Sequence, residues 1–215
     1  MSYTDIIQGD TCSMGKSKGK NEDYAIYVPG VGACVADGVG GAPLGDALAR
    51  LSCCVAMREL RCGKSAVEAI CQARDHVAEF VRTVDSPTSG ASLTAIKFGD
   101  TSMEAAWLGD VALFVNMRSV DGNKTRSTLE ECPTSHYMGR TTDEEPQRME
   151  VPMDVLSGVV ACTDGVWRRL GTQDIVSMME STLTVREKAA RLAMSEGLQD
   201  DSTALVLSVG RQETR

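Results

Sequence analysis

The sequence predicts an α+β fold in which antiparallel sheets and helices form layers. Two observations support this prediction: runs with the two-residue alternation of strands occur in groups, and helix-like segments follow one another in pairs between those groups. The chain has 215 residues, of which 42% are hydrophobic. This length and composition fit a single domain over residues 1–215, with a core that needs no disulfide bonds.

The first part of the chain is predicted to contain three strands and then two helices. The strands are "DIIQGDTCSM", "DYAIYVPG" and "GACVAD", and the turn residues of "VPGVG" connect the last two. A helix over roughly 43–61 follows, because its apolar residues recur at helical spacing. The next helix begins at "KSAVEAI", where Ser65 and Glu68 have the spacing of a capping box.

The middle of the chain returns to the period of strands in "ASLTAIKF", "MEAAWLG" and "VALFVNM", which predicts a meander. Residues 118–150 are polar, rich in turn residues and without clear periodicity. We expect this segment to be a short excursion, either a surface flap or a partly disordered region.

The last part of the chain is predicted to contain a strand, two helices and a final strand. Apolar order resumes in "VLSGVVACTDGV". The helices are "TQDIVSMMES" and "TVREKAARLAMSEG", and the second again has a capping-box pair, Thr184 and Glu187. The final strand is "STALVLSV".

Charge and composition exclude several classes of function. The net charge is −8 and the pI is about 4.9, which argues against a nucleic acid or an anionic membrane as partner. No apolar run approaches the ~18 residues of a membrane span, and the first residues lack the features of a signal peptide. We therefore expect a cytoplasmic protein. Its eight cysteines include no CxxC pair, so we expect reduced thiols and no structural zinc site.

Aspartates stand at the ends of two predicted strands. "ACVADGV" and "ACTDGV" both run from apolar residues into an aspartate followed by glycine, and these aspartates are Asp37 and Asp164. Acidic residues also precede two other strands, in "NED" and at Asp200. A single Asp-Gly pair is a common turn. Several acidic strand ends together favour a site for a hard divalent cation such as Mg²⁺ or Mn²⁺, which binds oxygen ligands from separate segments.

The chain resembles the small, single-domain bacterial members of the PP2C (PPM) class of metal-dependent protein serine/threonine phosphatases. The motifs that carry the resemblance are "KSKGKNEDY", "VADGVGG", "SGASLTA", "WLGD", "ACTDGV" and "DDST". Each motif alone is weak, but the six occur in the family's order and cover nearly the whole chain. The resemblance implies a four-layer αββα sandwich, with two central antiparallel sheets flanked by helix pairs.

The resemblance also implies two Mn²⁺ or Mg²⁺ ions and a role for each matching residue. Asp37 would bridge the ions, the Gly38 carbonyl would bind one, and Asp164 and Asp200 would bind the other. Glu22 and Asp23 would hold water around the ions. Asp110, together with Asp164, matches the place of a third, weaker ion in bacterial relatives.

The implied reaction is hydrolysis of phosphoserine or phosphothreonine by a water that bridges the two metals, without a phosphoenzyme. The implied partners are a phosphorylated protein substrate and, by analogy, a serine/threonine kinase or its targets. A monomer is expected.

Two departures from the family pattern motivate an alternative function. Lys18 stands where most members have a phosphate-binding arginine, so binding should be weaker or less oriented, although Lys16 or Lys20 could substitute. Val111 and Ala112 follow Asp110 where serine and arginine are usual, which removes its local support. A catalytically impaired module that binds phosphoproteins or another partner is therefore the alternative function.

Other chemistries have weaker signals. Cys162 and Arg168 have the C-x5-R spacing of cysteine-dependent phosphatases, but the apolar residues before the cysteine predict a core thiol. A serine–histidine–acid triad would have to use His76 or His136, and neither has a neighbouring nucleophile motif.

Overall fold

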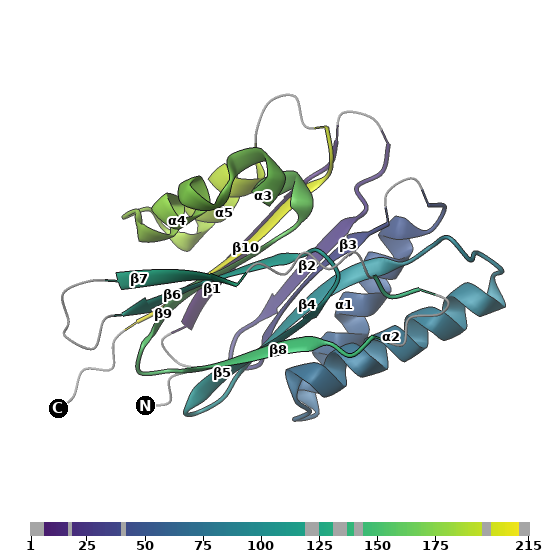
Figure 1. Ribbon diagram of the computed structural model, residues 1–215, viewed down its shortest axis with the longest axis horizontal. Helices are drawn as coiled ribbons and strands as arrows, with labels where there is room; N and C mark the ends of the chain where they lie inside the picture. Colours follow the sequence, from purple (N-terminus) through teal and green to yellow (C-terminus); the bar gives the residue numbers. More distant parts are fainter. Residues whose placement is uncertain are drawn as a thin grey trace.

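The computed structural model describes residues 7–16, 19–39, 42–118, 125–130, 137–139, 144–194 and 199–210, the segment 125–130 as backbone alone. Two antiparallel sheets of five strands each lie at the centre (Figure 1). Sheet I has the order β1 (Ile7–Met14), β10 (Ser202–Val209), β9 (Leu156–Cys162), β6 (Ala112–Arg118) and β7 (Thr125–Glu130). Sheet II has the order β2 (Asp23–Val28), β3 (Gly32–Gly38), β4 (Ala91–Phe98), β5 (Ser102–Leu108) and β8 (Gln147–Pro152).

Helices cover the outer face of each sheet, which confirms the predicted four-layer α+β sandwich (Figure 1). Sheet II is covered by α1 (Gly45–Arg61) and α2 (Ala66–Thr83). Sheet I is covered by α3 (Asp164–Leu170), α4 (Thr172–Glu180) and α5 (Val185–Ala193). We expected a pair of helices on that face too. The additional helix, α3, has only seven residues, too few for a helical period to show in the sequence.

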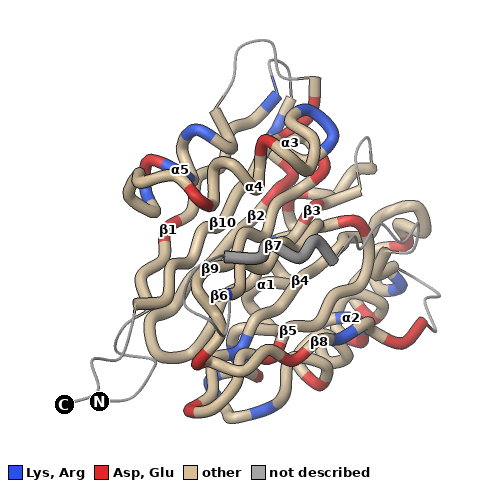
Figure 2. The backbone as a smooth tube through the Cα atoms, turned by 60° about the vertical axis from the view of Figure 1, so that its left-hand side comes forward, with Lys and Arg blue, Asp and Glu red and all other residues tan. Residues whose placement is uncertain are grey.

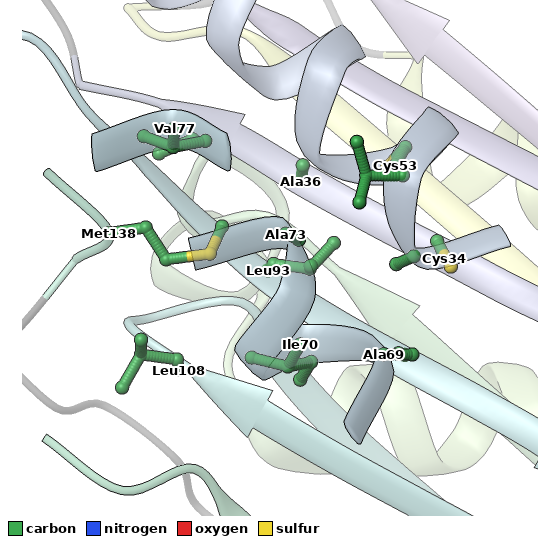
Figure 3. Close-up of a cluster of buried hydrophobic side chains, with 14 of the residues drawn as sticks. Cys34, Ala36, Cys53, Ala69, Ile70, Ala73, Val77, Leu93, Leu108 and Met138 are labelled. Atoms are coloured by element: carbon green, nitrogen blue, oxygen red, sulfur yellow. The ribbon is translucent and has the colours of Figure 1, made fainter. Parts of the chain in front are cut away.

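Strand β3 shows how the three apolar layers arise. Its alternate residues Ala33 and Val35 pack between the sheets, whereas Cys34 and Ala36 pack against the helices. Figure 3 shows Cys34 and Ala36 in the buried cluster that includes Cys53 of α1 and Ile70 of α2. Both faces of the central strands are therefore buried, which is why their sequences are almost continuously apolar.

The two predicted capping boxes are confirmed. The Ser65 hydroxyl accepts a hydrogen bond from the Glu68 amide at 3.1 Å, and the Glu68 carboxylate accepts one from the Ser65 amide at 2.9 Å. Thr184 and Glu187 form the same reciprocal pair at the start of α5. These bonds satisfy donors that the first helical turn cannot use itself. Helix α5 ends at Ala193, earlier than predicted, and residues 195–198 lie outside the described part.

Two strands lie within the segment expected to be an excursion. β7 pairs with β6 and β8 with β5, so each adds an edge strand to its sheet. β8 exposes most of its residues, and this polar edge position explains why its period was not visible in the sequence. Between them, Met138 is fully buried and forms a β-bridge with Ala91.

The seven described cysteines are free thiols, and Cys132 lies outside the described residues. Within the described ranges, no helix is long and apolar enough to span a bilayer.

Candidate active site

Antiparallel pairing brings acidic residues from separate segments to one end of the two sheets. Asp23 begins β2 and is the direct register partner of Asp37 near the end of β3. β9 ends at Cys162, two residues before Asp164, and β10, its antiparallel neighbour, begins just after Asp201. Figure 2 shows acidic positions beside α3 and the ends of β2 and β3. The strand-end aspartates of the sequence are therefore neighbours in space.

Asp37 lies at the centre of this acidic cluster. Burial raises the pKa of its carboxyl to about 10, and the charges of four other aspartates contribute to the rise. These are Asp23, Asp164, Asp110 and Asp200. A carboxyl group in such surroundings ionises at neutral pH only if a cation joins the cluster.

The Asp23 carboxylate is held from one side only. Its Oδ2 accepts a hydrogen bond of 2.7 Å from the Thr163 hydroxyl, which in turn accepts one of 3.0 Å from the Thr203 amide. Its Oδ1 is buried and has no hydrogen-bond partner among the described residues. The pKa of Asp23 is raised to about 7, mainly by burial; the hydroxyls of Thr163 and Thr203 oppose the rise, and the charges of Asp201 and Asp164 add to it. An orphaned buried oxygen of this kind suits a cation or its bound water.

Glycine follows both strand-end aspartates because the backbone of another element lies against it. A Cβ atom on Gly38 would lie 2.3 Å from the Gly45 carbonyl oxygen at the start of α1. A Cβ atom on Gly165 would lie 1.9 Å from the Asp201 carbonyl oxygen. Both distances are far below van der Waals contact, so only glycine permits this packing. The Asp-Gly pairs therefore do more than close turns.

Lys16 supplies a positive charge beside Glu22, Asp200 and Asp201. Its Nζ lies 2.8 Å from Glu22, 3.4 Å from Asp201 and 3.8 Å from Asp200. The hydrogen bond to Glu22 and the neighbouring aspartates raise the pKa of Lys16 against the effect of its partial burial. Asp201 is 3% exposed and also accepts hydrogen bonds from the amides of Lys16 and Glu22, at 2.7 and 2.8 Å.

The ion pairs of Lys16 with these carboxylates were not predicted, since Lys16 was considered only as a substitute for Lys18 in binding phosphate. The sequence feature that could have indicated them is Asp201, the second carboxylate of "DDST". Lys20 pairs with Asp46 at 3.3 Å instead, and Lys18 lies outside the described residues. The interpretation of Lys18 as a phosphate ligand stays a prediction.

Asp110 has support from distant residues in place of its sequence neighbours. The Ser92 hydroxyl donates a 2.8 Å hydrogen bond to its Oδ1, and Arg168 Nη2 lies 3.6 Å from its Oδ2. The Trp167 indole donates to the Asp110 carbonyl at 3.0 Å. Val111 and Ala112 are buried at the start of β6, so the departure there does not leave Asp110 unsupported.

Comparisons with known proteins give a result for the fold alone. No family model and no curated protein matches the chain. Among solved structures, the catalytic domain of the phosphatase PstP, in complex with 2 manganese ions, has a TM-score of 0.79 at 20% identity, with 96% of this chain and 99% of that chain covered. The chain has the PP2C fold.

Two further bacterial phosphatases agree. Stp1 from Staphylococcus aureus has a TM-score of 0.79 at 11% identity and covers 96% of both chains. PppA from Pseudomonas aeruginosa, described as a key regulatory component of the type VI secretion system (T6SS), has 0.76 at 19% identity over 95% of this chain and 98% of that one. The PP2C fold predicted from six short motifs is thus confirmed.

The ligand roles expected for a PP2C fold remain predictions. The structure brings together Glu22, Asp23, Asp37, Gly38, Asp110, Asp164 and Asp200. Asp164 has a raised pKa because of burial, and Arg168 partly opposes that rise. As they stand, no three acidic, histidine or cysteine side chains in the described ranges converge on one point that could hold an ion. Ions there would also need backbone carbonyl and water ligands, as hard cations commonly do.

The competing chemistries find no support in the PP2C fold. Cys162 is fully buried, and burial raises the pKa of its thiol, so it is a poor nucleophile. Arg168, its C-x5-R partner, is paired with aspartates. His76 Nδ1 lies 2.8 Å from the Gln72 carbonyl on its own helix, and His136 lies outside the described residues.

Proposed function

We propose that this protein is a metal-dependent phosphoprotein phosphatase that hydrolyses phosphoserine or phosphothreonine with two Mn²⁺ or Mg²⁺ ions. The observation that carries the proposal is the partly buried acidic cluster around Asp37 at one end of a PP2C fold. A phosphate dianion cannot approach such a cluster unless cations reverse its charge. A PP2C-fold neighbour, PstP, was solved with 2 manganese ions, which supports the same chemistry here.

The residues of the cluster fit such ions. Asp37, the Gly38 carbonyl, Asp164 and Asp200 would hold them directly. The unpartnered Oδ1 of Asp23 and the close approach at Gly38 are the structural features that support this fit. Bound ions of this kind polarise phosphoryl oxygens and make water acidic near neutral pH.

The chain's own residues position these ligands. The Thr163 hydroxyl orients Asp23 by donating to Oδ2, and the buried Oδ1 has no hydrogen-bond partner among the described residues. Lys16 offsets the charge of Glu22 and Asp201. Because these side chains are held by hydrogen bonds and burial, the site is arranged before any ligand arrives, which lowers the reorganisation needed during reaction.

One observation favours the alternative, a catalytically impaired module that binds phosphoproteins. Protein cations already pair with two expected metal ligands: Lys16 with Asp200, and Arg168 with Asp164. In an impaired module these contacts would stabilise the fold without any ion. A phosphorylated protein partner, a kinase connection, a cytoplasmic location and a monomeric state belong to either proposal.

The deciding experiment is hydrolysis of p-nitrophenyl phosphate and of a phosphothreonine peptide, with Mn²⁺ and with EDTA. We expect turnover that requires Mn²⁺ and is lost in Asp37→Asn. Asp154→Asn, which removes an exposed carboxylate elsewhere, is the matched control and should behave as wild type. A folded protein that binds Mn²⁺ but shows no turnover would support the binding module. Turnover that survives EDTA would overturn the metal mechanism.

A further inference from the structure

The guanidinium of Arg168 lies between two acidic residues of the candidate site. Its Nη1 is 2.8 Å from Asp164 Oδ2, one helical turn earlier, and its Nη2 is 3.6 Å from Asp110 Oδ2. Asp110 follows β5 of sheet II, and Asp164 begins α3 after β9 of sheet I. The arginine therefore links acidic residues that the two sheets bring to the site. A planar guanidinium with several donors is suited to contact two carboxylates at once.

Two further contacts hold this arrangement. The guanidinium stacks over the Trp167 ring, with 5.1 Å from Cζ to the ring centroid, and the same indole donates to the Asp110 carbonyl. The other oxygen of Asp110, Oδ1, accepts the Ser92 hydroxyl. Both carboxylate oxygens of Asp110 therefore already have protein partners.

These contacts disagree with one expectation from the resemblance, in which Asp110 and Asp164 support a third ion. We propose that the Arg168 guanidinium takes the place of that ion, so that this protein binds two divalent ions and not three. The inference rests on the proposed function, because it assumes that the other two ions bind.

The replacement changes the chemistry of this corner of the site. A guanidinium keeps one positive charge at all working pH values, so it offsets the repulsion between Asp110 and Asp164 without any metal. It cannot make a bound water acidic, and it does not give up a proton itself. Arg168 is thus a positioning residue that holds the two carboxylates.

Whether a third ion binds depends on its competition with the Arg168 guanidinium for Asp110 and Asp164. Arg168 is 60% exposed, so each ion pair is weakened by water, and a divalent ion carries twice the charge. Against this, the arginine is attached one turn from Asp164 and is stacked on Trp167, so its local concentration is high whereas an ion must come from solution.

The test counts ions on the full chain by calorimetric titration with Mn²⁺ and by electron paramagnetic resonance of unbound Mn²⁺. We expect two ions in wild type and a third in Arg168→Ala, with affinity roughly tenfold or more above any third event in wild type, because a nearby positive charge is removed. Arg168→Gln, which keeps more of the side-chain volume, is the second variant if alanine impairs folding.

Two controls isolate the cause. Arg169→Ala removes the same charge from the same helix, but Arg169 donates to the Leu192 carbonyl and not to the acidic cluster, so it should bind two ions. Arg168→Ala combined with Asp110→Asn should lose the third ion again. Neither control depends on turnover.

The outcomes separate the two proposals. Two ions in both wild type and the Arg168 variants would overturn this inference and leave the proposed function intact. A third ion of similar affinity in wild type would also overturn it. If wild type binds no ion at all, the proposed function fails and this inference fails with it.

Discussion

Asp23 and Asp37 face each other as direct partners in the antiparallel pairing of β2 and β3. Like charges in this position destabilise a sheet, and burial increases the cost because water no longer screens them. Besides burial, the Asp23 charge raises the pKa of Asp37, and the Asp164 charge raises the pKa of both. A pair kept in so unfavourable a position is typical of a functional site.

The stability of the metal-free protein should fall as the pH rises. The folded-state pKa values of about 10 for Asp37 and about 7 for Asp23 lie above their ordinary value near 4. Their stabilising contribution is therefore complete below about pH 4 and is lost as the pH rises to about 7 for Asp23 and 10 for Asp37. Each group contributes at most about 1.4 kcal/mol per pH unit within its window.

Thermal unfolding in EDTA between pH 5 and 9 would measure this slope. Mn²⁺ should raise the melting temperature more at pH 8 than at pH 5, because protons compete with the metal for the carboxylates. An EDTA curve that rises with pH over this range would contradict the prediction.

Asp37→Asn should stabilise the metal-free protein at pH 8 while it removes stabilisation by Mn²⁺. At pH 8 the folded wild type must keep the Asp37 carboxyl protonated, whereas the unfolded chain ionises it. An amide needs no proton, so we expect a gain of about 1–3 kcal/mol in the free energy of unfolding. At pH 4 most of the gain should disappear, because the unfolded wild-type chain then also begins to hold this proton. Urea denaturation at both pH values checks this, with Asp154→Asn as a control near zero. A loss of stability at pH 8 would show that Asp37 has a structural cation partner in the protein.

Lys16 and Asp201 should be energetically coupled. Lys16→Met leaves the buried Asp201 carboxylate with its two amide donors but without its ion pair, and we expect a loss of about 1–3 kcal/mol. Asp201→Asn in the same chain should recover part of this loss, giving a coupling of about 1 kcal/mol in a double-mutant cycle.

Lys20→Met removes a lysine that is 79% exposed and paired with Asp46, and it should change stability by no more than about 0.5 kcal/mol. Additive effects of the Lys16 and Asp201 variants would mean that their contact contributes nothing.

Gly38→Ala should destabilise the fold by about 1–3 kcal/mol, because its Cβ would overlap the backbone of Gly45 and push α1 away from β3. Chemical denaturation would measure the loss. Gly139→Ala is the matched control: its nearest neighbour would be 3.3 Å away, on the Tyr137 side chain, so the cost should be smaller. Equal effects at the two positions would show that the close approach at Gly38 can relax.

Well-buried helices and strands can be predicted from the sequence of this protein, whereas its edge strand β8 and its shortest helix, α3, cannot. β3 and β4 are nearly continuous apolar runs because both of their faces are buried, and α1 has a helical period because one of its faces is buried. β8 lies at a sheet edge with a polar composition, and α3 is one short helix that begins at Asp164, so neither has a clear pattern. Hydrophobic periodicity in a sequence arises from the burial of one face of an element. An element with few buried residues therefore has no clear periodicity.

By itself, the sequence determined the layered α+β class, the capping boxes and the acidic strand ends, since all of these are local properties of neighbouring residues. Only the tertiary structure decided which charges meet: Lys16 with Asp201, and Arg168 with both Asp110 and Asp164. Most of these contacts join residues far apart in the chain, and no periodicity encodes them. Strand register and helix packing place the side chains together, and electrostatics then selects their partners.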